Sequence, residues 1–63
     1  MEKAIKAFEE KLQLWKSLAE LAKEPREEDF FLAEACGALH LLEEMFPSYS
    51  QELQEIYTSY GFQ

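Results

Sequence analysis

Three side chains that could bind a transition metal recur every four residues in the second half of the chain. Cys36, His40 and Glu44 would share one narrow face of a helix. A thiolate and an imidazole one turn apart can chelate zinc or a related ion. Any three residues at this spacing share a face, however, and the chain has one cysteine and one histidine in all. We therefore expect a bystander cysteine beside a solvent-facing histidine, with no metal and no cofactor.

The same Cys36–His40 pair has the residue types of a nucleophile and its base. Such catalysis also needs an orienting group, oxyanion donors and a pocket, which one helical face does not supply. A chain of 63 residues has little room to enclose a substrate. The sequence therefore predicts a protein that is not an enzyme.

Helical periodicity and two prolines divide the chain into three expected helices, over about 2–24, 26–46 and 49–60. Glu24 precedes Pro25 and is therefore disfavoured in the α region, which ends the first helix. Pro47 ends the second. The result is an all-α fold in a single domain, 1–63: an antiparallel helical hairpin of two long helices with a short C-terminal third helix.

The third helix has recognisable signals at both ends. Ser48 followed by Gln51 is the pattern of a capping box. Gly61 suits the position after the helix, and Phe62 would then fold back on Tyr57 in a Schellman ending.

The segment Ser50-Gln51-Glu52-Leu53 resembles the start of the Ser-Gln-Glu-Leu-Asp signature of the small sporulation-type aspartyl-phosphate phosphatases, which are acidic helical hairpins. Gln54 stands where that family has its essential aspartate, so no catalysis is carried over. The match covers four of 63 residues, and we infer no family membership from it.

The first helix has more apolar surface than one partner helix can cover, about 200° of its circumference. Its two adjoining stripes are Ile5, Phe8, Leu12, Trp15, Ala19 and Ala22, and Ala7, Leu14, Leu18 and Leu21. A chain this short buries only about 60% of the surface that it exposes when unfolded. We therefore expect a homodimer packed as a small helical bundle.

The second helix also has two apolar faces. The expected core face comprises Phe31, Leu32, Ala35, Ala38, Leu39, Leu42, Met45 and Phe46, and the second stripe comprises Phe30, Ala33, Gly37 and Leu41. Glycine in mid-helix costs about 0.5–1 kcal/mol relative to alanine. Gly37 either makes room for Trp15 or the third helix of the same chain, or lets this stripe contact a symmetry mate or a target.

The net charge of −7 lies entirely in the second part of the chain. Residues 1–24 hold five Lys and five Glu, whereas residues 25–63 hold eight acidic residues against one Arg. Direct binding to nucleic acid or to an anionic membrane is disfavoured, because both need a basic patch. The chain has no membrane-spanning apolar run and no secretory signal pattern, and one unpaired cysteine fits a reducing compartment, so we expect a cytoplasmic protein.

The acidic residues at helix N-termini are explained by the helix dipole, but Glu43 and Glu44 lie near a C-terminus, where carboxylates gain nothing. They are therefore candidates for recognising a basic partner. The expected protein-binding site comprises Phe30, Ala33, Gly37, Leu41, Glu34, His40, Glu43 and Glu44.

Together these features predict a non-enzymatic acidic protein-binding module, a small adaptor or inhibitor that occludes a surface of a larger protein. A more specific hypothesis is mimicry of nucleic-acid charge. The alternative is a structural or chaperone-like subunit of a permanent hetero-complex.

Overall fold

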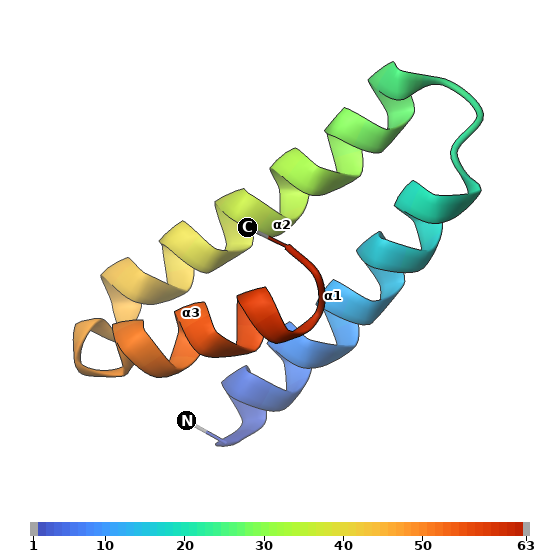
Figure 1. Cartoon of the computed structure of the whole chain (residues 1–63). Coiled ribbons are helices and arrows are strands. Elements are labelled where there is room, and N and C mark those ends of the chain that lie inside the picture. The colour runs from blue at the N-terminus through green and yellow to red at the C-terminus, as the bar shows by residue number, and fades with distance from the viewer. Residues whose placement is uncertain (1, 63) are drawn as a thin grey trace.

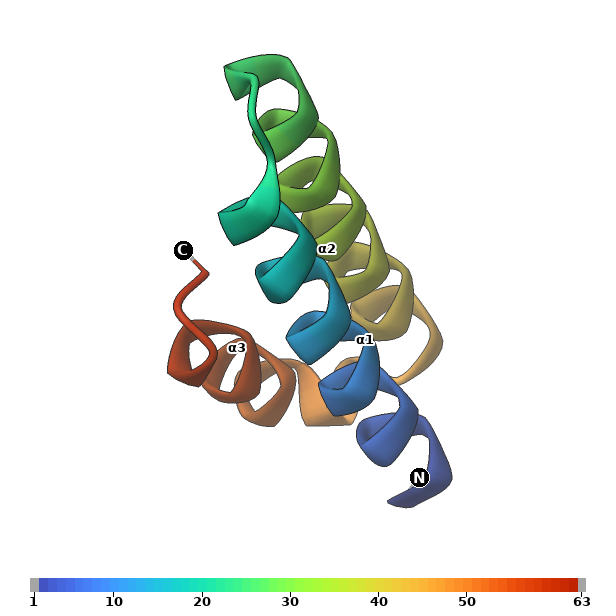
Figure 2. The same cartoon turned by 90° about the vertical axis from the view of Figure 1, so that its right-hand side faces the viewer.

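The computed structural model describes residues 2–62 and consists of three α-helices with one short 3-10 turn. The helices are α1 (Glu2–Leu21), α2 (Pro25–Met45) and α3 (Ser50–Ser59), and the 3-10 turn Pro47–Tyr49 precedes α3. The first two form an antiparallel hairpin, and α3 lies on one face of it, at the end away from the α1–α2 turn (Figure 1; Figure 2). The predicted all-α hairpin with a short third helix is confirmed.

The two prolines set the helix boundaries as expected. Glu24 is extended, with φ −119° and ψ 142°, and Pro25 opens α2. Phe46 leaves the helix before Pro47, with φ −132° and ψ 67°. The first helix ends at Leu21 rather than at 24, because the chain needs the intervening residues to reverse direction; the other bounds agree within one residue.

The core lies where the three helices meet, and it consists of Phe8, Leu12, Ala35, Leu39, Leu53, Tyr57 and Phe62. Leu12 of α1 and Leu53 of α3 are completely buried, so α3 closes the core over its own hairpin. Three residues of the expected core face lie outside this core: Phe31 and Phe46 are half-buried, and Met45 is 58% exposed. At 100° per residue, Met45 lies about 120° around α2 from Leu39, beyond the reach of the core.

The C-terminal end of α3 is a Schellman motif, as predicted. Gly61 has a φ of +92°. The backbone amide of Phe62 donates to the carbonyl oxygen of Tyr57 at 3.3 Å, and the backbone amide of Gly61 donates to the carbonyl oxygen of Thr58 at 3.0 Å. The ring of Phe62 stacks on that of Tyr57, with centroids 5.2 Å apart. The turn therefore returns an aromatic side chain to the core.

The N-terminal end of α3 differs from the prediction. The capping box of Ser48 and Gln51 does not form, because Tyr49 is the residue before the helix and no side chain caps it. Residues 47–49 are taken up by the 3-10 turn, in which the amide of Tyr49 donates to the carbonyl of Phe46 at 3.0 Å. Ser48 thus lies one position too early to cap α3.

The two glycines of the chain should respond to alanine in opposite directions. Gly61→Ala places a Cβ at positive φ and 3.0 Å from Nζ of Lys16, so we expect the free energy of unfolding to fall by about 1–2 kcal/mol. In Gly37→Ala the new Cβ meets no atom within 4 Å, and alanine is the better helix former in mid-helix. We therefore expect the free energy of unfolding to rise by about 0.5–1 kcal/mol. Urea denaturation followed by circular dichroism measures both, and a loss of stability in Gly37→Ala would contradict the open space at that position.

Candidate protein-binding groove

The second apolar stripe of α2 lines a shallow groove between α1 and α2, which we call the α1–α2 groove. It is lined by Trp15 from α1 and by Phe30, Ala33, Glu34, Gly37, Ala38 and Leu41 from α2. Its lining includes no residue of α3. The groove therefore belongs to a part of the hairpin that the chain's own third helix leaves uncovered.

Large side chains flank small ones along this groove. Phe30 and Leu41 are each 58% exposed, and Ala33 and Gly37 between them are exposed as well. A Cβ built on Gly37 would meet nothing within 4 Å. The interpretation that Gly37 makes room for Trp15 or the third helix of the same chain is therefore wrong.

The second stripe of α1 is also uncovered. Leu14 is 47% exposed and Leu21 is 76% exposed, whereas Phe8, Leu12 and Ala19 of the first stripe are buried. This confirms, for the residues that the structure describes, that the hairpin and its third helix cannot bury all the apolar surface of the chain.

The charged and polar residues of the expected site do not all lie at the groove. Glu34 lines the α1–α2 groove, whereas Glu44 is exposed but does not line it. His40 and Glu43 do not line the groove: His40 lies beside Cys36, and Glu43 contacts α3. Trp15 and Ala38 also line it, and both pack partly against the core, as expected for Ala38. In the sequence, Trp15 lies at the edge of its stripe, next to the second stripe of α1. This edge position was the signal from which its place in the groove lining could have been predicted.

Glu43 joins α2 to α3. Its Oε2 accepts hydrogen bonds from Oγ of Ser50 at 2.6 Å and from Nε2 of Gln54 at 2.7 Å. These two bonds hold the pKa of Glu43 below its ordinary value of 4.5; partial burial opposes them, and the nearby His40 adds to the lowering. The helix dipole gives Glu43 no benefit at this end of α2, but its carboxylate is hydrogen-bonded within the chain, which explains its position without a partner.

The Cys36–His40 pair lacks the alignment of a catalytic or chelating pair. The sulfur lies 4.0 Å from Nδ1 and 3.9 Å from Nε2, so neither ring nitrogen is directed at it. Burial raises the pKa of the neighbouring Tyr57, and the adjacent Cys36 raises it further. Among residues 2–62, no three potential metal ligands gather.

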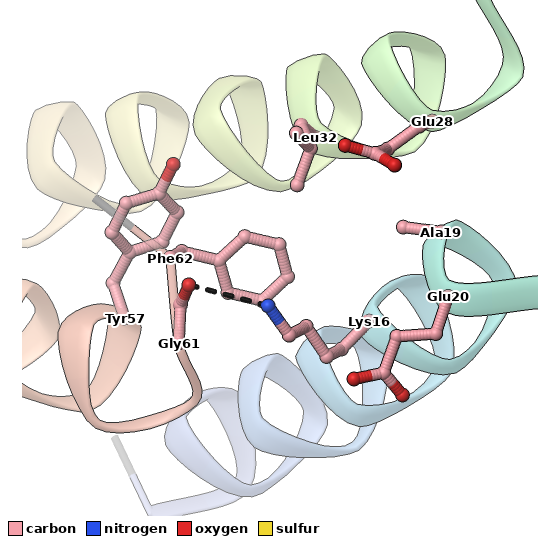
Figure 3. A pocket seen from close by; sticks show the side chains of 8 residues that line it. All are labelled: Lys16, Ala19, Glu20, Glu28, Leu32, Tyr57, Gly61 and Phe62. Carbon is pink, nitrogen blue, oxygen red and sulfur yellow. Dashed lines mark hydrogen bonds between the residues drawn. The ribbon is translucent and has the colours of Figure 1, made fainter. Parts of the chain in front are cut away.

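A second hollow lies on the α3 side of the hairpin, lined by Lys16, Ala19, Glu20, Glu28, Leu32, Tyr57, Gly61 and Phe62 (Figure 3). Phe62 enters it from the end of α3 and is only 3% exposed. Nζ of Lys16 donates to the carbonyl oxygen of Gly61 at 3.3 Å and lies 5.5 Å from the centroid of the Phe62 ring. The chain therefore occupies part of this hollow itself.

In the part of the chain that the structure describes, no helix has the length and apolar character needed to cross a bilayer. Comparison with protein-family models, with curated proteins and with solved structures finds no match to this chain.

The acid side of the stability profile should depend on Glu43. Because its folded pKa is lowered, the stability that its carboxylate supplies is complete above pH 4.5 and is lost as pH falls through the folded pKa. We expect Glu43→Gln to be less stable than wild type at neutral pH and to converge with it in acid. Urea denaturation at pH values on either side of 4.5 measures this. Glu44→Gln is the control, because Glu44 is the exposed neighbour, and it should keep the acid dependence of wild type. If the free energy of unfolding of Glu43→Gln changes with pH as that of wild type does, the role of Glu43 is refuted.

Proposed function

We propose that this chain is a non-enzymatic acidic protein-binding module, an adaptor or inhibitor that occludes a surface of a larger protein. The observation that carries the proposal is the pair Phe30 and Leu41, each 58% exposed on either side of an open Gly37. Large contiguous apolar patches are rare on monomeric proteins and commonly mark interaction sites.

Apolar contacts would supply most of the affinity. Full burial of a Phe or Leu side chain is worth about 1.5–3 kcal/mol, and aromatic anchors near the centre of an interface dominate its energy. Phe30 stands edge-on against Phe31, with ring centroids 5.4 Å apart, so its ring is braced by a neighbour before any partner binds.

The carboxylates would supply selectivity for a basic surface. Of the eight acidic residues in 25–63, seven are exposed, namely Glu27, Glu28, Asp29, Glu34, Glu44, Glu52 and Glu55. Complementary charge accelerates encounter and rejects acidic partners. This distribution also favours the narrower hypothesis that the chain mimics nucleic-acid charge, in which case binding weakens steeply as salt rises.

The same exposed face would serve a permanent subunit of a hetero-complex or a homodimer. A permanent subunit should be poorly folded or aggregated alone. In a homodimer through the α1–α2 groove, two chains of net charge −7 would repel each other, a cost that a basic partner avoids. Light scattering over a dilution series separates these cases.

A site-specific cross-linker tests the proposed function. We would place a photoreactive phenylalanine at position 41 and, in a matched control, at the exposed position 51 of α3. A basic protein should cross-link in source-cell extract at position 41 and not at 51.

That protein would then be purified and its affinity measured by calorimetry against wild type and Phe30→Ala. Loss of a central aromatic anchor should weaken binding by about thirtyfold, corresponding to about 2 kcal/mol. Equal cross-linking at both positions, or unchanged affinity of Phe30→Ala, would contradict the proposal.

A further inference from the structure

We infer that the α1–α2 groove accepts one α-helix of a basic partner, which crosses α2 at Gly37. This inference rests on the proposed function and specifies the element that the module recognises. It follows from the order of side chains along the groove, from the helices that form its walls and from the charge around it.

The order of side chains suits a helix crossing. The stripe runs from Phe30 to Leu41, which at 1.5 Å per residue is about 16 Å, or three helical turns. Its large residues stand at the two ends, and Ala33 and Gly37 lie between them. Packed helices lie about 8–10 Å apart, and small residues at the crossing point allow the shorter distances. The open space above Gly37 is where a second backbone would approach.

The walls suit a helix as well. Trp15 stands on the α1 side and Ala38 on the α2 side, so a helix in the groove would contact both members of the hairpin. The chain's own α3 already packs on this hairpin (Figure 2). It contributes no residue to the lining of the groove. A bound helix would therefore add a fourth helix to the three-helix arrangement.

The charge selects a basic helix over a second copy of this chain. Glu34 lies in the groove itself, and no basic residue lines it. Of the other five carboxylates of α2, Glu43 is bonded to α3 and Glu28 lines the hollow on the α3 side, which leaves Glu27, Asp29 and Glu44 exposed elsewhere on α2. A second α2 would bring another Glu34 into the same interface. Lysine or arginine side chains flanking the apolar face of a partner helix would instead meet these carboxylates.

Two synthetic peptides test this inference on the full chain. Each is an amphipathic helix of about 16 residues with Leu and Ala on one face; the other face is Lys in the first peptide and Glu in the second. Trp15 is the only tryptophan and lines the groove, so its emission reports binding directly. We expect the Lys peptide to shift the emission saturably, and the Glu peptide to leave it unchanged at the same concentrations.

Two variants locate the binding. Gly37→Phe fills the groove at the crossing point, and the open space there lets the fold persist, which circular dichroism checks. We expect it to weaken Lys-peptide binding by about tenfold or more. Gln51→Phe adds the same ring to an exposed position of α3 and should bind as wild type does.

Four results would overturn the inference. Undiminished binding to Gly37→Phe places the peptide elsewhere, and equal binding of the Glu peptide removes the charge argument. A wild-type dimer that Gly37→Phe converts to a monomer assigns the groove to a second copy. If a basic protein cross-links at position 41 while the Lys peptide fails to bind, the helix inference fails and the protein-binding function stands.

Discussion

The packing of a ten-residue third helix against one face of the hairpin determines most of this structure. Leu53 and Tyr57 of α3, with Phe62 beyond it, close a core against α1 and α2. Within residues 2–62, the structure describes no other element that covers the opposite face, and Phe30 and Leu41 are exposed there.

Polar contacts with the hairpin hold α3 at both ends. Near its start, Ser50 and Gln54 donate to Glu43 of α2. Beyond its end, Lys16 of α1 donates to Gly61 and lies over the ring of Phe62. Each contact involves a charged residue of the hairpin, Glu43 near the start of α3 and Lys16 beyond its end. The sequence alone offered no structural reason for Glu43, and the structure shows that it contacts the third helix. Glu34 and Glu44 take no part in these contacts and are exposed.

Local rules explain what the sequence predicted well. Pro25 and Pro47 constrain the residues before them, and Gly61 with Phe62 forms a turn whose bonds span only a few residues. The uncovered stripe of α2 also followed from periodicity. Failures arose where distant residues decide the outcome: Glu43 finds its partners seven and eleven residues away, and a 3-10 turn displaced the cap expected at Ser48. Trp15 packs partly against the core and also lines the groove, because a helical stripe does not reveal which of its edges a third helix leaves open.

The exposure of Leu21 and Leu14 on α1 has a consequence for colloidal behaviour. Both side chains are exposed in the single chain, and a net charge of −7 opposes close approach of two copies at neutral pH. The isoelectric point is near 4.5, where that repulsion vanishes. The carboxylate that ties α3 to α2 has a pKa lowered below 4.5, so it becomes protonated only on further acidification. Solubility therefore declines before internal cohesion, and the protein should precipitate through its leucine faces before it unfolds completely.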